Sequence, residues 1–128
     1  MKFEHFALNV PDARACAGWY VEHMGMSIVR SVDQEPYTRF LADTSGRVMV
    51  EFYTNPAAPV PDYRTVHPLS FHTAFQTEDA RPARTRLELA GASFFKEETL
   101  PDGSLLVMMR DPWGVPLQLC QRTRPFPG

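Results

Sequence analysis

The sequence lacks most features of proteins that form disulfides, bind nucleic acid or associate with a membrane. It has two cysteines in 128 residues, Cys16 and Cys120, which give neither a disulfide framework nor a zinc spacing. A formal net charge of −2 provides no basic excess to attract phosphate backbones. The first ten residues have no long apolar run, as a signal peptide or membrane span would. We therefore expect a cytoplasmic protein with reduced thiols that binds neither nucleic acid nor a membrane.

What the sequence does contain is an internal repeat. Four polar residues define it: His5, Glu51, His72 and Gln118. The first two are 46 positions apart, the last two are also 46 apart, and the second pair follows the first by 67 positions. The same offset lays Asp-Ala-Arg at 12–14 on an identical segment at 79–81. A repeat of this kind predicts two similar modules whose side chains can meet at one point.

The first module, residues 1–55, is predicted to fold as strand, helix and three strands. Imperfect alternation of apolar and polar residues indicates a first strand over 2–10. A helix is expected over 13–24, with Asp12 as its N-cap and Gly25 at its end. Turn-forming residues separate three further segments, predicted as strands at 26–32, 37–42 and 47–54.

The second module, residues 69–122, is predicted to repeat this order after a proline-rich connector. Several prolines in the connector, 56–68, oppose a regular strand ladder there. The elements expected beyond it are a strand at 69–76, a helix at 79–90, and strands at 93–98, 104–110 and 115–121. The tail, 123–128, is expected to be irregular. With 128 residues and 44% hydrophobic content, both modules fit one domain, residues 1–128.

The repeat also brings together chemistry that suits a metal ion. Each module places a histidine on its first strand and an oxygen-bearing side chain on its last. Two imidazoles, one carboxylate and one amide oxygen suit a divalent ion such as Ni²⁺, Zn²⁺, Co²⁺, Mn²⁺ or Fe²⁺, with positions left for water or substrate. A single strand histidine would more often just bond to a neighbour. The shared register favours the metal hypothesis for all four residues.

Three segments carry a resemblance to a known family: 4–12 (EHFALNVPD), 71–75 (FHTAF) and 111–119 (DPWGVPLQL). With the repeated strand order, they make the chain resemble the vicinal oxygen chelate superfamily over about residues 2 to 121. This group includes glyoxalase I, bleomycin-resistance and fosfomycin-resistance proteins, and extradiol dioxygenases. The resemblance implies an α+β fold in which two tandem βαβββ modules form a curved mixed sheet that cups a central site. It also implies a homodimer.

By position, the resemblance assigns the metal ligands to His5, Glu51, His72 and Gln118. The pattern is most similar to glyoxalase I, except that glutamate is usual where this chain has Gln118. An amide oxygen can bind a metal, but it cannot accept a proton at neutral pH. Glu51 is therefore the only catalytic base available for a glyoxalase-like reaction. An extradiol dioxygenase fits less well, because its last-strand ligand is a glutamate.

Two functions remain open on this basis. The favoured one is a glyoxalase-like metal-dependent lyase or isomerase that acts on a small oxygenated substrate by carbonyl polarisation and proton transfer. The alternative is a non-catalytic protein of the bleomycin-resistance type, which sequesters a small-molecule ligand in the same fold. Whether the chain is an enzyme depends on this choice, and metal content separates the two.

Two further residues invite a functional interpretation that we do not favour. Arg39 could pair with a substrate carboxylate inside the cup, but a salt bridge at the surface is the expected role. His67, beside Pro68 in the connector, could be an additional ligand only if the connector folded inward. We expect that His67 is not a ligand.

Overall fold

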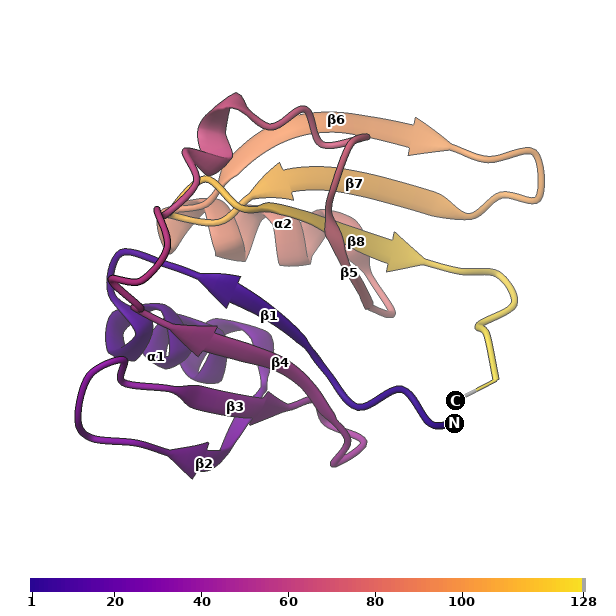
Figure 1. Cartoon of the computed structure of the whole chain (residues 1–128). Coiled ribbons are helices and arrows are strands. Elements are labelled where there is room, and N and C mark those ends of the chain that lie inside the picture. Colours follow the sequence, from indigo (N-terminus) through magenta and orange to yellow (C-terminus); the bar gives the residue numbers. More distant parts are fainter. Residues whose placement is uncertain (128) are drawn as a thin grey trace. The chain divides into compact units, whose positions relative to one another are not determined.

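Each half of the chain folds as a helix packed on a four-stranded sheet (Figure 1). The computed structural model describes residues 1–127; Gly128, the end of the predicted tail, lies outside them. The chain divides into two units between Pro61 and Asp62. This division falls inside the predicted connector, so each unit corresponds to one predicted module.

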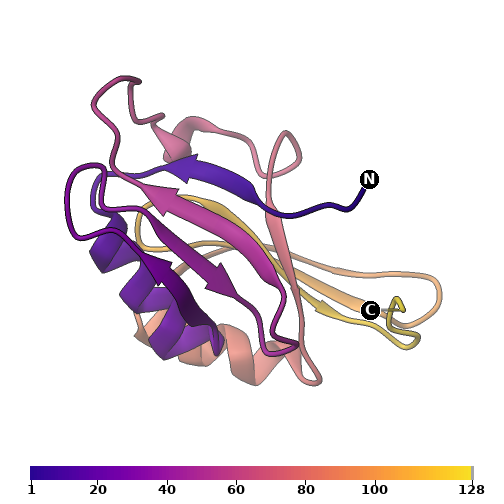
Figure 2. The same cartoon turned by 60° about the horizontal axis from the view of Figure 1, so that its bottom comes forward.

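The first unit contains one helix and sheet A, whose strand order is β1-β4-β3-β2. Strand β1 is parallel to β4, and the other neighbours are antiparallel. The elements are β1 (Phe6–Asn9), α1 (Ala13–Met24), β2 (Ser27–Ser31), β3 (Arg39–Ala42) and β4 (Val48–Tyr53). Figure 2 shows from a second side that β2 forms the outer edge of this sheet.

The second unit repeats this arrangement in sheet B, with the order β5-β8-β7-β6. Its elements are the short 3-10 helix η1 (Tyr63–Thr65), β5 (Thr73–Gln76), α2 (Ala80–Leu89), β6 (Ser93–Thr99), β7 (Leu105–Arg110) and β8 (Pro116–Gln121). The predicted α+β fold of two tandem βαβββ modules is therefore confirmed. Within residues 1–127, neither helix is both long and apolar enough to traverse a bilayer.

The sequence repeat is reproduced in the strand register. In sheet A, Phe6 pairs with Val50, and in sheet B, Thr73 pairs with Leu117. Both members of the second pair follow those of the first by the offset of 67 found in the sequence. The parallel strand pair is thus built the same way in both units.

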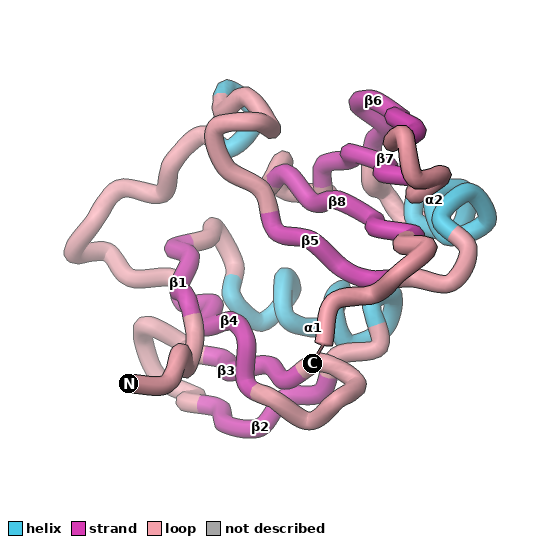
Figure 3. Tube along the Cα trace, turned by 90° about the vertical axis from the view of Figure 1, so that its right-hand side faces the viewer, coloured by secondary structure: helices cyan, strands magenta, loops and turns pink. Residues whose placement is uncertain are grey.

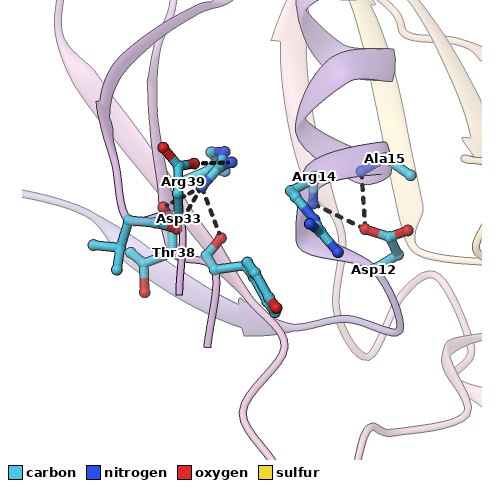
Figure 4. A network of polar contacts seen from close by, with 8 residues as sticks. Asp12, Arg14, Ala15, Asp33, Thr38 and Arg39 are labelled. Atoms are coloured by element: carbon cyan, nitrogen blue, oxygen red, sulfur yellow. Dashed lines mark hydrogen bonds and ion pairs between the residues drawn. The ribbon is translucent and has the colours of Figure 1, made fainter. Parts of the chain in front are cut away.

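The ends of α1 show why this segment is helical. The Asp12 carboxylate accepts hydrogen bonds from the backbone N–H groups of Arg14 and Ala15, each at 3.1 Å (Figure 4). Gly25 follows the helix with φ of 69°, a left-handed conformation that glycine adopts without a Cβ clash. The predicted N-cap, C-terminal glycine and helix bounds are all confirmed.

The core of the first unit lies between α1 and one face of sheet A (Figure 3). Val50 and Phe52 of β4 are buried there, and the Phe52 ring lies 5.3 Å from the ring of Tyr20 on α1. Because side chains alternate along a strand, Glu51 projects from the opposite face. We call this opposite face, which carries Glu51, the ligand face of sheet A.

The first strand of each module is shorter than predicted. Strand β1 begins at Phe6 rather than at residue 2, because its only neighbour in the sheet pairs with it from Val50 onward. Strand β5 begins at Thr73 rather than at residue 69, because Ser70 N–H closes a turn onto the His67 carbonyl at 2.8 Å. Both candidate histidines therefore lie one residue before a strand.

Candidate metal-binding site

The first unit brings His5 and Glu51 together. Glu51 on β4 is paired with Ala7, two residues beyond His5 on the same side of the chain. His5 Nε2 lies 3.5 Å from Glu51 Oε1, and both side chains are largely buried. On the other side of the ring, His5 Nδ1 lies 2.8 Å from Glu4 Oε1. A carboxylate only accepts hydrogen bonds, so an Nδ1–H group would donate to Glu4 and leave Nε2, on the side of Glu51, to coordinate an ion.

This pair fits half of a metal site. Two ligands on adjacent octahedral positions, each about 2.1 Å from an ion, are about 3 Å apart. The 3.5 Å separation between His5 Nε2 and Glu51 Oε1 is close to that value. Glu4 on Nδ1 completes a carboxylate–histidine arrangement that is common behind metal-bound imidazoles. A nitrogen and a carboxylate oxygen suit a divalent transition ion.

The second unit orients His72 by a different partner. His72 Nδ1 lies 2.7 Å from the backbone carbonyl oxygen of Pro68, which can only accept a hydrogen bond. Nδ1 therefore donates this hydrogen bond, and Nε2 is the nitrogen that could coordinate an ion. Pro68 is fully buried, so this carbonyl is a fixed acceptor. A neutral carbonyl supports His72 where a carboxylate supports His5.

Gln118 occupies the position in β8 that Glu51 occupies in β4. Gln118 pairs with Ala74, as Glu51 pairs with Ala7. Its Oε1 atom accepts a hydrogen bond from the Cys120 thiol at 3.3 Å. Burial raises the pKa of the Cys120 thiol, which keeps the thiol protonated and able to donate. The amide oxygen of Gln118 is thus oriented by a neighbour on the same strand face.

The described part of the chain, residues 1–127, contains no group of three or more His, Cys, Asp or Glu side chains that could hold a metal ion. Each unit places one histidine and one oxygen-bearing side chain, the candidate ligands, at equivalent positions. Binding of a single ion by all four residues stays a prediction.

The connector before His72 is fixed by two arginines that the sequence did not single out. Arg110 on β7 donates to the carbonyl oxygens of Tyr63 and Val66, each at 2.9 Å. Arg64 donates to the carbonyl oxygen of Pro112 at 2.6 Å. These bonds hold the chain that leads to His72. An arginine near a strand end gives no sequence signal for this role.

Phe40 is a further neighbour of the first ligand pair. It pairs with Glu51 across β3 and β4, and so lies on the ligand face of sheet A. Its ring centroid is 5.1 Å from that of His5, with the rings at 88°. Strand alternation in the sequence places Phe40 on a sheet face, but its contact with His5 depends on how β1 and β3 flank β4.

Arg39 forms a salt bridge, as the sequence favoured, but its side chain is buried and not at the surface as expected. It forms an ion pair with Asp33 at 2.9 Å and donates to the carbonyl oxygens of Val32 and Thr38 at 2.7 and 3.2 Å (Figure 4). It pairs with Phe52 and is 8% exposed, so it lies on the helix side of sheet A. These contacts fix the loop between β2 and β3 and leave the substrate role without support.

His67 also has local partners. Its Nδ1 atom accepts a hydrogen bond from the Leu69 backbone N–H at 3.1 Å. Its ring contacts Phe95 edge-on, with 5.6 Å between centroids. Both contacts support the expectation that His67 is not a ligand.

The two βαβββ modules, each with a histidine and an oxygen-bearing side chain at equivalent positions, point to the class to which the protein belongs. A sequence profile described as Glyoxalase/Bleomycin resistance protein/Dioxygenase superfamily matches residues 2–119. The chain is a member of this superfamily. The resemblance seen in the sequence is thereby confirmed. A comparison with curated proteins found no match.

Solved structures of similar fold include binding proteins and enzymes. SMU.1112c is 24% identical, with a TM-score of 0.70 over 94% of this chain and 98% of that one. TnmS3, an antibiotic binding protein from Streptomyces sp. CB03234, is 17% identical, with a TM-score of 0.69 over 96% and 97%. A glyoxalase I mutant from Zea mays is 23% identical, with a TM-score of 0.73 over 96% of this chain but only 46% of that one. At these identities the likeness establishes the fold alone.

Proposed function

We propose that the protein is a metal-dependent lyase or isomerase of the glyoxalase type that acts on a small oxygenated substrate. The observation that carries the proposal is the 3.5 Å approach of His5 Nε2 to Glu51 Oε1, at positions that the second module repeats with His72 and Gln118. These four residues would hold a divalent ion such as Ni²⁺, Zn²⁺, Co²⁺, Mn²⁺ or Fe²⁺. When bound, the ion would polarise a substrate oxygen.

The residues of the chain have distinct roles in this proposal. His5 and His72 present Nε2 because Glu4 and the Pro68 carbonyl occupy the protons on Nδ1. Glu51 is the carboxylate of the set, and it would take a proton from the substrate carbon next to the polarised oxygen and return it at the neighbouring position. Its side chain is 17% exposed, which limits competition from bulk water.

Gln118 changes the net charge of such a site. With one carboxylate in place of two, the ion keeps a formal charge nearer +1, so it is a stronger Lewis acid but is bound less tightly. The Cys120 thiol on Gln118 Oε1 supports an amide oxygen that faces a fixed direction. We therefore propose a weakly held ion that is loaded from solution.

A second function, sequestration of a ligand without chemistry, is favoured by two observations. Gln118 removes one of the two carboxylates that a glyoxalase-like site would use. The similar structure TnmS3 is described as an antibiotic binding protein. In this alternative, the same faces would bind a drug-like molecule and no proton would move.

Metal content and proton exchange test the two functions against each other. The protein is brought to equilibrium with Ni²⁺ or Zn²⁺ by dialysis, and bound metal is measured as the excess over the dialysis buffer. Exchange of the α-proton is then assayed with a panel of 2-oxo aldehydes and their thiol adducts. The enzyme hypothesis predicts about one ion per chain and exchange that disappears in Glu51→Ala. Less than about a tenth of an equivalent of metal would leave ligand sequestration as the function.

Two properties of the whole protein accompany the proposal. We propose a homodimer, as is common for short two-module chains of this type, and light scattering at several concentrations would measure it. We also propose a cytoplasmic location. Both cysteines are buried and neither forms a disulfide, which suits a reducing compartment.

A further inference from the structure

A row of three residues crosses the ligand face of sheet A from the metal-ligand candidate to the outer edge. Glu51 on β4 pairs with Phe40 on β3, and Phe40 pairs with Arg30 on β2. Residues directly opposite each other on antiparallel strands project from the same face. Arg30 therefore lies on the face that carries Glu51, at the strand that has no further neighbour.

The contacts along this row are continuous. The Phe40 ring meets the His5 ring edge-on at 5.1 Å, and the Arg30 guanidinium carbon lies 6.0 Å from the Phe40 ring centroid. Arg30 is exposed, so its donors are accessible. Neighbouring strands are about 4.8 Å apart, which places the backbones of β4 and β2 about 10 Å apart. A guanidinium on a flexible side chain can reach inward over part of that distance.

The second module repeats the row with a second cation. Gln118 pairs with Met108, and Met108 pairs with Lys96 on the edge strand β6. In both sheets the register shifts immediately before the basic residue, between Ile28 and Arg30 and between Phe94 and Lys96. A bulge of this kind re-aims the side chain that follows it. Arg30 and Lys96 thus occupy equivalent positions on equivalent faces.

Charged residues on edge strands also protect sheets from aggregation. That role needs a charge at any exposed position of the edge strand. It does not require the charge to share a row with the candidate metal ligand, nor to follow a bulge in both modules. The repeated placement points instead to a group that lies on the ligand face and carries negative charge.

We propose that Arg30 is a specificity-determining residue that binds the carboxylate of a flat substrate lying across Phe40. The proposal rests on the proposed function for the other end of the substrate, whose oxygen atoms would face His5 and Glu51. Arginine suits a carboxylate because its planar fork forms two parallel hydrogen bonds. The rings of Phe40 and His5, which meet edge-on, suit contact with a planar molecule. The substrate class is therefore a flat, oxygenated acid whose carboxylate lies at the far end from the oxygen atoms that would face His5 and Glu51.

A pair of probes tests this inference by binding alone. 4-(Hydroxyacetyl)benzoate has a carbonyl and a hydroxyl oxygen on adjacent carbons, a flat ring and a carboxylate, and its methyl ester is matched but neutral. Calorimetric titration of both probes is performed on the natural sequence, Arg30→Gln and Arg30→Lys. The natural sequence should bind the acid roughly 10-fold more tightly than the ester, as expected for a charge-assisted hydrogen-bonded pair. Arg30→Gln should lose this preference while ester affinity is unchanged, and Arg30→Lys should keep part of it.

Each titration is run on metal-free protein and on protein incubated with Ni²⁺. If no metal binds, the proposed function fails, but the acid-to-ester ratio of the metal-free protein still reports on Arg30. Arg86→Gln removes the same charge from an exposed position of α2 and should leave the ratio unchanged. The inference is overturned if the natural sequence does not prefer the acid, or if Arg30→Gln retains the preference.

Discussion

At the residue scale, the candidate site depends on how single side chains are oriented. His5 and His72 are both fixed through Nδ1, one by the Glu4 carboxylate and one by the Pro68 carbonyl. Both imidazoles thus leave Nε2 available for an ion, although the group that contacts Nδ1 is charged in one case and neutral in the other. A carboxylate behind an imidazole raises its basicity as a ligand, so His5 should bind an ion more strongly than His72 does.

Replacing Glu51 tests the strongest predicted ligand. Glu51→Ala should lower Ni²⁺ affinity by more than the roughly 10- to 100-fold that is typical for a supporting residue, because it removes a group that would touch the ion. Competition titration with a chromophoric chelator measures this change. Glu78→Ala, at an exposed position before α2, is the matched control and should bind Ni²⁺ like the natural sequence. Equal affinity in all three proteins would exclude Glu51 as a ligand.

Replacing Gln118 by glutamate should strengthen the site. Gln118→Glu supplies a second carboxylate at the position where Oε1 now accepts a bond from Cys120. We expect Ni²⁺ affinity to rise by about 10-fold or more, since a second anionic oxygen neutralises more of the charge of the ion. The same chelator titration measures it. Unchanged or weaker binding in Gln118→Glu would show that Gln118 does not face the ion.

At the element scale, the two modules form a built-in comparison. Helices α1 and α2 both follow an aspartate with nearly the same backbone angles, φ and ψ of −145° and 100° at Asp12 and −143° and 99° at Asp79. Only Asp12 accepts side-chain hydrogen bonds from the first turn of its helix. The two aspartates thus share the backbone conformation of an N-cap, but they differ in whether the side chain caps the helix.

Alanine at these two caps should therefore have unequal effects. Asp12→Ala should lower the free energy of unfolding by about 1 kcal/mol, because two N–H groups lose their acceptor. Asp79→Ala should cost clearly less. Urea denaturation with a common slope measures both changes. A larger loss in Asp79→Ala than in Asp12→Ala would contradict the capping pattern.

The hairpin between β6 and β7 should contribute to acid sensitivity through Asp102. Hydrogen bonds from the Ser104 backbone N–H, the Ser104 hydroxyl and the Thr123 hydroxyl lower the pKa of Asp102. A lowered pKa in the folded state gives stability that is present above the ordinary pKa near 4 and is lost as pH falls through the lowered value. Asp102→Asn should be less stable than the natural sequence at pH 7.

Unfolding at pH 7 and at pH 3 separates this effect from a general loss of stability. The difference in stability between the natural sequence and Asp102→Asn should shrink at the lower pH, because the carboxylate of the unfolded chain is then largely protonated, and unfolding takes up a proton. A difference that is the same at both pH values would show that the charge of Asp102 does not stabilise the hairpin.

At the scale of the whole molecule, the sequence contained the repeat and much of the architecture. The order of elements followed from apolar alternation and from residues that begin or end helices, such as Asp12, Gly25 and Gly91. The bounds of α1 were predicted correctly. The first strands were predicted too long because alternation continues before β1 and β5, where no neighbouring strand is paired. The alternation of apolar and polar residues shows which side chains share a face of the segment. Where the strand begins depends on where a neighbouring strand forms hydrogen bonds with it.

The candidate site could be predicted only in part from the sequence. The 46-residue spacing within each pair placed a histidine and an oxygen ligand on neighbouring strands, and the first pair does meet. The supports of the histidines were not predicted, because Glu4 acts through a neighbouring side chain and Pro68 through its carbonyl. The same holds for Arg110 and Arg64, whose partners are backbone atoms distant in sequence. Such contacts depend on tertiary structure and carry no local motif.

We propose that each module supplies half of one metal site, and the number of metal ions per chain in two matched variants is the decisive measurement. Ni²⁺ per chain is measured by equilibrium dialysis in the natural sequence, His5→Ala and His72→Ala, with folding verified by circular dichroism. We predict about one ion per chain in the natural sequence and loss of stoichiometric binding in both variants, although the two histidines belong to different units. Full retention of the ion in either folded variant would contradict a site shared by the two modules.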